Sequence, residues 1–589
     1  NKDPYLNLKD AIQSGSTETG PQQVFHAHGE QSDAHDSLRP DETQIRQTIV
    51  PALKSALKNE TNNDIVTGAM IALAKTGDEK SESGESEFEG IIKPFLKDSN
   101  QEIRETAALA LGILANPDSI ATLVHLMHDT PTGRDAMGKT QVDYRTQAFA
   151  AYGLALVGHA SQPAERALVF DALVYAADND TTATRDVAVA CLLAMGLVPV
   201  DTIEAIPAEE GSDTVSAPSS SRSAQIDYLL AYFQDESNNF MTRAHAPTSV
   251  ARLMRGLDAA QTDAFKARVA PIFLDAIGRR SKAEKEIQQS CVLALGEMCD
   301  SDKDPLDIEI RKALMAVPEE ISDAQTRHFS MIALGQAAGR PGSGPDPGSG
   351  SAELQKELLK TMAKGKSSLR TWSAMGVGVW GNTLLENEQT LPNEVVQALR
   401  SSMIEEKNPD RFGAYAIACG MVQDTDAQEN LLKKLDQLKT NEARGYACVA
   451  LGMMGSRSSI EHISKIVKES QYRPDLLRQA AVALGLLGDK DTVDEMIDML
   501  KGAKGLATQA ALSSALGFIG DRRSVDPLVE MLENKQLTAT ARGFAAVALG
   551  IVADKEPLPW NSKISFGVNY RASTHTLNDP EGTGVLNIL

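Results

Sequence analysis

The residues best suited to hold a metal ion lie near the amino end of the chain. They are His26, His28, Asp33, His35 and Asp36, and three of the ten histidines of the chain fall between positions 26 and 35. Imidazole and carboxylate groups bind zinc or copper, and a His-x-His spacing puts two ligands on one side of an extended chain. No cysteine and no fixed ligand framework accompany them. A metal site and a solvated arm both remain open for this stretch.

The cysteines and the known catalytic motifs give no further chemistry. Cys191, Cys291, Cys299, Cys419 and Cys448 are odd in number, have no CxxC spacing and lie in apolar contexts. We expect them to be free thiols in the core and not a disulfide framework. The chain lacks G-x-x-x-x-G-K-[ST], H-E-x-x-H and G-x-S-x-G motifs. We therefore predict no catalytic residues and no cofactor.

The elements that would position any site are set by an internal repeat. Four segments end alike, in GYACVALGMMG, QAAVALGLLG, AALSSALGFIG and GFAAVALGIVA. Their shared glycines are Gly452, Gly485, Gly517 and Gly550, and Gly420 precedes them in the same frame, so the period is 32 or 33 residues. Two helical patterns recur in each period, which is typical of an α-solenoid. The second helix is apolar on most faces and must be buried by its neighbours.

An arginine recurs eight residues before the repeat glycine in six units. Together with the glycine frame, this pattern resembles HEAT repeats, specifically the short variety first noted in phycobilisome-lyase-like proteins. The resemblance covers most of the chain and implies an all-α solenoid of HEAT-like helical hairpins. It also implies that each arginine pairs with an aspartate or a carbonyl of an adjacent turn, with ligand binding as the alternative. Gln509 replaces the arginine before Gly517, and Arg411 and Arg478 are one residue out of frame.

A partial aromatic row stands six residues before the repeat glycine. Phe329, Trp372 and Tyr446 occupy this position in the middle repeats, and Phe544 occupies it in the last repeat. Equivalent positions of a solenoid form a row, so these side chains either pack between repeats or form an exposed strip. Aromatic residues are enriched in interface hot spots, so we name the three middle residues as candidates for partner binding.

Composition limits the partners. Lys and Arg number 58 against 80 Asp and Glu, which gives a net charge of −22. This charge argues against nucleic acid and favours basic or neutral protein partners, or self-assembly. No apolar run reaches the ~18 residues of a membrane span.

We divide the chain by the limits of the repeats. The divisions are an amino-terminal arm (1–41), amino-terminal HEAT-like repeats (42–196), a flexible linker (197–222), divergent middle repeats (223–339), a Gly/Pro/Ser loop (340–352), regular HEAT-like repeats (353–554) and an extended capping tail (555–589).

The tail breaks the helical pattern. Ile564, Phe566, Val568 and Tyr570 alternate with polar or small residues, which is a strand signature. The last repeat ends a solenoid and would expose an apolar face, so we expect the tail to cap it, or to pair with a partner. Trp560, Phe566 and Tyr570 are therefore further partner-binding candidates.

The tail also bears on location. Its PWN and NYRA segments resemble the ends of large bacterial HEAT-repeat proteins of unknown role, many of them exported. The chain begins at Asn1 and not at methionine, which is compatible with a removed leader. We expect an extracytoplasmic location in preference to a cytoplasmic one. The function predicted is a non-catalytic scaffold for protein interaction or structural assembly. The alternative is a HEAT-type lyase-like enzyme or chaperone acting on a prosthetic group or a protein side chain.

Overall fold

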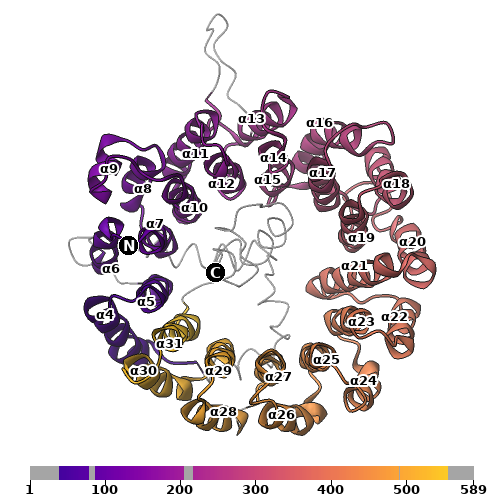
Figure 1. The fold of residues 1–589 in the computed structure, drawn as a ribbon. Coiled ribbons are helices and arrows are strands. Elements are labelled where there is room, and N and C mark those ends of the chain that lie inside the picture. Colours follow the sequence, from indigo (N-terminus) through magenta and orange to yellow (C-terminus); the bar gives the residue numbers. More distant parts are fainter. Residues whose placement is uncertain (1–38, 78–85, 204–216, 490, 555–589) are drawn as a thin grey trace, which may run out of the picture.

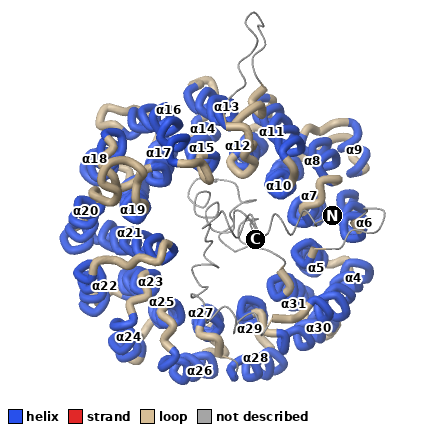
Figure 2. The backbone as a smooth tube through the Cα atoms, turned by 180° about the vertical axis from the view of Figure 1, so that it is seen from behind, coloured by secondary structure: helices blue, strands red, loops and turns tan. Residues whose placement is uncertain are grey.

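The computed structural model describes residues 39–77, 86–203, 217–489 and 491–554. These residues form helices and connecting turns, without a β-strand, and the predicted all-α solenoid is confirmed. The helices are arranged as two concentric layers in a closed ring (Figure 1). The view from behind shows the same closed outline (Figure 2).

The first helix of each repeat belongs to the outer layer. Its members are α4 (Val50–Asn59), α6 (Glu87–Ile92), α8 (Ser119–Met127), α11 (Pro163–Asp178), α13 (Arg222–Gln234), α16 (Ala259–Ile277), α18 (Pro305–Glu320), α20 (Ser351–Lys364), α22 (Asn393–Glu405), α24 (Gln428–Leu435), α26 (Ile460–Glu469), α28 (Asp491–Gly502) and α30 (Val525–Glu533).

The second helix of each repeat belongs to the inner layer. Its members are α5 (Asn63–Thr76), α7 (Gln101–Leu114), α10 (Tyr144–Ala160), α12 (Asp186–Met195), α15 (Ala246–Leu253), α17 (Lys285–Met298), α19 (Ala324–Gly339), α21 (Ser367–Glu386), α23 (Pro409–Met421), α25 (Asn441–Met453), α27 (Pro474–Leu486), α29 (Leu506–Ile519) and α31 (Ala539–Val552).

Short helices complete the described chain. They are α3 (Glu42–Gln44), the π-helical turn η1 (Ile45–Ile49), the 3₁₀ turn η2 (Lys93–Lys97), α9 (Pro131–Met137), α14 (Phe240–Arg243), and the 3₁₀ turns η3 (Thr425–Ala427), η4 (Arg457–Ser459) and η5 (Arg522–Ser524). Helix α9 lies within the predicted insertion of the third repeat.

Side-chain caps fix where many inner helices begin. Asn62, Asn100, Asp143, Asp323 and Thr538 each accept hydrogen bonds from backbone N–H groups of the first turn of the helix that follows. Such caps satisfy donors that a helix leaves without internal partners. The turns between outer and inner helices are thereby set at a similar place in successive repeats.

The ring closes because the first repeat packs on the last. The inner helices α31 and α5 are in contact, and so are the outer helices α30 and α4. The carboxylate of Glu60 accepts a hydrogen bond from Arg542 at 2.6 Å, and that of Asp554 accepts one from Lys75, also at 2.6 Å. The expectation that the last repeat presents an uncovered face is therefore wrong, because α5 covers α31. The tail itself, and its predicted strand, lie outside the described residues.

Candidate functional site

Five of the six recurring arginines have the structural role that the resemblance implied. Arg104, Arg327 and Arg370 each donate to a backbone carbonyl of the turn before their own helix. Arg542 donates to the carbonyl of Leu532 near the end of the preceding outer helix, and Arg145 donates to Glu105 of the preceding inner helix. Gln509, which interrupts the pattern, also donates to a backbone carbonyl, that of Ala503 at 2.9 Å. These side chains therefore hold the turns between helices in place by hydrogen bonds, which favours the structural role over ligand binding.

The predicted aromatic row divides into buried and accessible members. Phe329 is only 1% exposed, so the hypothesis that it contacts a partner is wrong. Trp372 is half-buried and stacks on His328 of the preceding inner helix, with ring centroids 5.0 Å apart. Tyr446 remains 37% exposed, although its ring lies beside Gly413, where a methyl group would come within 2.4 Å of it. The row thus combines both alternatives: its members pack between repeats, and two of them keep an accessible surface.

Two aliphatic rows lie next to the aromatic row. The aromatic position is six residues before the repeat glycine, and the two aliphatic positions are three residues before it and one residue after it. Successive positions are three or four residues apart, about one helical turn, so all three lie on the same side of the helix. In helices α21, α23, α25, α27 and α31 most of these positions hold apolar side chains that are half-buried or, at Tyr446, exposed. We call them the apolar belt: Trp372, Met375, Val379, Ile417, Met421, Tyr446, Val449, Val482, Leu486, Phe544, Val547 and Ile551.

The belt faces the centre of the ring. The residue before the repeat glycine points about 200° away from the residue after it, because a helix turns by about 100° per residue. That preceding position is a fully buried leucine in six inner helices, namely Leu111, Leu334, Leu451, Leu484, Leu516 and Leu549. Its burial marks the side packed on the outer layer. The opposite side is the inner wall (Figure 1).

The belt is confined to one half of the ring. The residues three before the repeat glycine in α7, α10 and α12 are Leu109, Ala150 and Leu193, and none is more than 1% exposed. In α23, α25 and α27 the same position holds Ile417, Val449 and Val482, all half-buried. Ser514 is the exposed polar residue at this position of α29. A set of accessible aliphatic side chains at a repeated position is the kind of surface that binds a partner.

No acid–base or nucleophilic group of the described chain is set for reaction at the belt. The Cys448 thiol in α25 is buried, and burial raises its pKa to about 12. Burial likewise raises the pKa of the Cys419 thiol in α23. Both thiols therefore stay protonated at neutral pH and are poor nucleophiles. All five cysteines are buried thiols outside any disulfide, as predicted.

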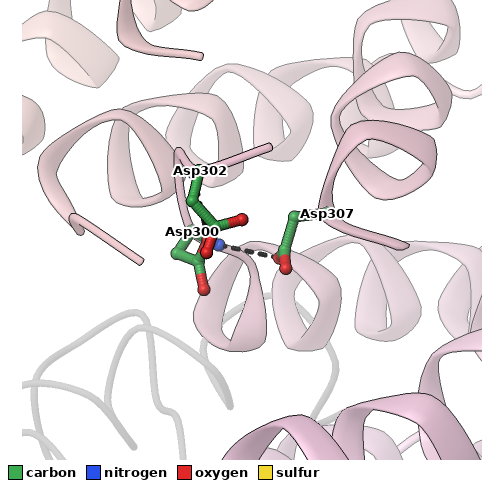
Figure 3. Close-up of side chains that lie close together, drawn as sticks. All are labelled: Asp300, Asp302 and Asp307. Carbon is green, nitrogen blue, oxygen red and sulfur yellow. Dashed lines mark hydrogen bonds between the residues drawn. The ribbon is translucent and has the colours of Figure 1, made fainter. Parts of the chain in front are cut away.

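A cluster of buried carboxylates lies away from the belt, at the start of α18. Asp300, Asp302 and Asp307 bring oxygens within 4.8 Å of one another (Figure 3). Lys266 of α16 occupies the cluster, with its ammonium 3.0 Å from Asp300 and 2.6 Å from Asp307. Burial and the nearby Asp307 charge raise the pKa of Asp300.

Every carboxylate oxygen of this cluster already has a partner. Asp307 accepts from the Asp300 backbone and from Lys266, while Asp302 accepts from the backbones of Asp304 and Gly344. A lysine side chain thus stands where a cation would bind, and the cluster does not fit a metal site.

The cluster instead holds the Gly/Pro/Ser loop that precedes α20. Backbone groups of Ser301 pair with those of Arg340 and Gly350. A methyl group on Gly342 would lie 2.2 Å from Asp302, and one on Gly350 would lie 2.7 Å from Arg311. These glycines are therefore required for close approach, a role that sequence reasoning did not foresee.

An open groove of about 670 Å³ lies on the outer side, between α4 and α6. Its cations are partly paired within the chain, since Arg46 bonds to Glu42 at 2.6 Å and Lys54 bonds to Glu87. The groove offers no convergent set of catalytic groups.

The remaining predicted site residues cannot be placed. His26, His28, Asp33, His35 and Asp36 lie outside the described residues. So do Trp560, Phe566 and Tyr570 of the tail. Among the described helices, none is both long enough and apolar enough to cross a membrane.

Two concentric helical layers and a glycine frame define a helical repeat protein. A sequence profile of HEAT repeats matches residues 469–550. The chain is a HEAT-repeat protein. No curated protein sequence is significantly similar to it.

Solved structures of larger helical proteins resemble it weakly. Kap121p bound to Ste12p aligns at 12% identity and a TM-score of 0.36, over 93% of this chain and 56% of that one. Importin beta aligns at 12% identity and a TM-score of 0.32, over 89% of this chain and 79% of that one. The chain thus spans about half the length of Kap121p. Likenesses this weak carry no argument about function.

The sequence held a signal for the aliphatic rows that we did not use. Ile417, Val449, Val482 and Val547 recur with the period of the repeat glycine and are no less regular than the aromatic row. Apolar residues recur at nearly every position of these inner helices, so only burial in the folded ring separates the belt from the core.

Proposed function

We propose that this protein is a non-catalytic protein-interaction scaffold whose apolar belt binds a polypeptide with apolar side chains along one side. The observation that carries the proposal is the recurrence of accessible aliphatic residues on consecutive inner helices. A solenoid presents a long continuous surface to partners, and closure into a ring places this surface on a concave wall. Apolar surface left accessible at repeated positions gains free energy when a partner covers it.

The charge of the chain restricts the partner further. A net charge of −22 repels acidic segments, so a neutral or basic segment is favoured. The belt itself is uncharged. Affinity therefore comes from apolar contact, and charge selects among candidate partners.

The test is affinity capture from the native host with three forms of the full chain. The belt variant carries Val449→Asp and Val482→Asp, and the matched control carries Leu168→Asp and Ile404→Asp. The control residues are 55% and 43% exposed on the outer helices α11 and α22. We expect a set of proteins that the native chain and the control retain and that the belt variant loses.

Equal capture by all three forms would contradict the proposal. Melting curves of the variants check that each keeps its fold, because a general loss of structure would also abolish capture.

A further inference from the structure

We propose that the apolar belt is occupied by the carboxyl-terminal segment of the same chain, residues 555–589, when no partner is bound. This inference rests on the proposed function, because it names a ligand for the same surface. Its occupant is a segment of this chain that follows directly on the last described residue.

The segment leaves the ring at the belt. Helix α31 contributes Phe544, Val547 and Ile551 to the belt and ends at Val552. Two residues later, Asp554 is held by the Lys75 ammonium at 2.6 Å, and both side chains are largely buried. The last described residue of the chain is thus held within a few residues of the surface that we propose the segment covers.

The segment is long enough to reach the middle of the belt. Phe566 lies twelve positions after Asp554, and twelve residue steps span up to ~40 Å when extended. Packed helices lie ~8–10 Å apart, so α25, three inner helices before α31, is ~30 Å away. A tethered ligand within reach acts at roughly millimolar effective concentration, so modest contacts suffice to dock it.

The pattern of the segment matches a shallow apolar wall. Ile564, Phe566, Val568 and Tyr570 share one side of an extended chain and cover ~20 Å, the width of two to three inner helices. The opposite side carries Ser565, Gly567 and Asn569, and it would face the solvated centre. Residues 555–589 include three basic and three acidic side chains, so the acidic ring does not repel them.

The face of α31 that these side chains were expected to cover is already covered by another helix. Helix α5 covers the face of α31 that the tail was predicted to cap, and Gly550 lies against Ala72 there. The amino-terminal arm also starts near this half of the ring, since Arg39 lies beside Gly520 at the end of α29. It is the weaker occupant because residues 15–38 are polar and contain few aliphatic side chains. The belt therefore stays available to the apolar side chains of the tail.

Photo-crosslinking in the purified full chain tests the inference. The crosslinking residue benzoylphenylalanine replaces Phe566 in one form and Gly567 in another, and mass spectrometry maps the adducts. We expect intramolecular adducts on α23, α25 or α27 from position 566 and few from position 567, which lies on the other side. Adding Val449→Asp and Val482→Asp should reduce the adducts roughly tenfold.

Other adduct patterns would overturn the inference. These are adducts confined to the outer helices or to residues 1–38, adducts to a second copy, or equal yields from positions 566 and 567. The two positions compare forms with an unaltered belt, so the result does not depend on the folding of the belt variant. The purified protein contains no partner, so failure here leaves the capture experiment unaffected, and failure of capture leaves this one readable.

Discussion

The junction that closes the ring and the junctions inside it use the same contacts at different positions in the chain. At the internal junction of α29 and α31, a methyl group on Gly517 would lie 3.1 Å from Ala548 Cα. At the closing junction, one on Gly550 would lie 2.6 Å from Ala72 Cα. Arg542 reaches Glu60 across the closing junction, as Arg104 reaches Asp143 across an internal one. The first repeat thus takes the place of a next repeat.

The difference is that internal neighbours such as α29 and α31 are connected through one outer helix and its turns, whereas α5 and α31 stand near opposite ends of the described chain. Closure therefore must overcome the entropy of bringing distant segments together, which internal junctions avoid. In return, closure forms the Lys75–Asp554 ion pair. The closing junction is consequently the one place where the ring can part without breaking a repeat, and an open form would expose complementary ends suited to head-to-tail assembly.

The largest expected effect comes from removing a buried lysine at an internal junction. Lys266→Met leaves Asp300 and Asp307 buried without their cation and should destabilise the fold by ~3–5 kcal/mol. Lys75→Met at the closing junction should cost less, because Asp554 keeps 15% of its side chain exposed and the ends can separate. Chemical unfolding of both variants measures this difference. Equal losses would show that the closing junction is as constrained as an internal one.

Overpacking the glycine frame should have the next largest effect. Gly517→Leu and Gly550→Leu each insert a side chain against a helix backbone, which costs ~1–3 kcal/mol or more. Only Gly550→Leu should also enlarge the particle in small-angle scattering, because that strain is relieved when the ends part. An unchanged radius of gyration for Gly550→Leu would mean that the junction absorbs the side chain.

Acid should lower the stability of the closing junction by a smaller amount, and an ion pair within one repeat provides the comparison. The hydrogen bond from Arg542 lowers the pKa of Glu60, and that from Arg411 lowers the pKa of Glu406, within a repeat, to about 2. An ionised group with a lowered folded pKa stabilises the fold above its unfolded pKa of ~4.3, and the contribution is lost as pH falls through the folded value. The stability difference between the native chain and Glu60→Gln should therefore be full at pH 7 and shrink below pH ~4.

The matched variant Glu406→Gln should likewise show its full difference from the native chain above pH ~4.3, and that difference should shrink progressively as the pH falls from ~4.3 towards 2. Melting midpoints at pH 7, 5, 4 and 3 compare the two. A Glu60→Gln difference that does not vary with pH would argue against an ionised Glu60 at the closing junction.

The smallest expected effect on stability is at the belt. Val482→Asp replaces a half-buried side chain on the inner wall and should change the free energy of unfolding by no more than ~1 kcal/mol, since surface positions tolerate substitution. Leu484→Asp, two residues along the same helix, replaces a fully buried side chain and serves as the contrast. Similar losses for both would show that Val482 belongs to the core.

Sequence reasoning predicted the repeats, the two layers and the fastening role of the arginines, because each depends on contacts within one repeat or with the next. It erred at Phe329, because the same aromatic position is buried in α19 and accessible in α25. It did not find Lys266, because this lysine and its partners Asp300 and Asp307 lie in the divergent middle repeats, where no periodic pattern marked them.

The sequence by itself determined that this chain is a helical solenoid, since the 32–33-residue period and the apolar pattern of the helices around each repeat glycine fix the helices. The tertiary structure alone decided that the solenoid closes on itself and that Val449 and Val482 face its centre. Closure depends on small rotations summed over every repeat, and no single repeat encodes their total. Once the ring is closed, α5 covers the face of α31 that the sequence left open, and the inner wall becomes the apolar surface available for binding.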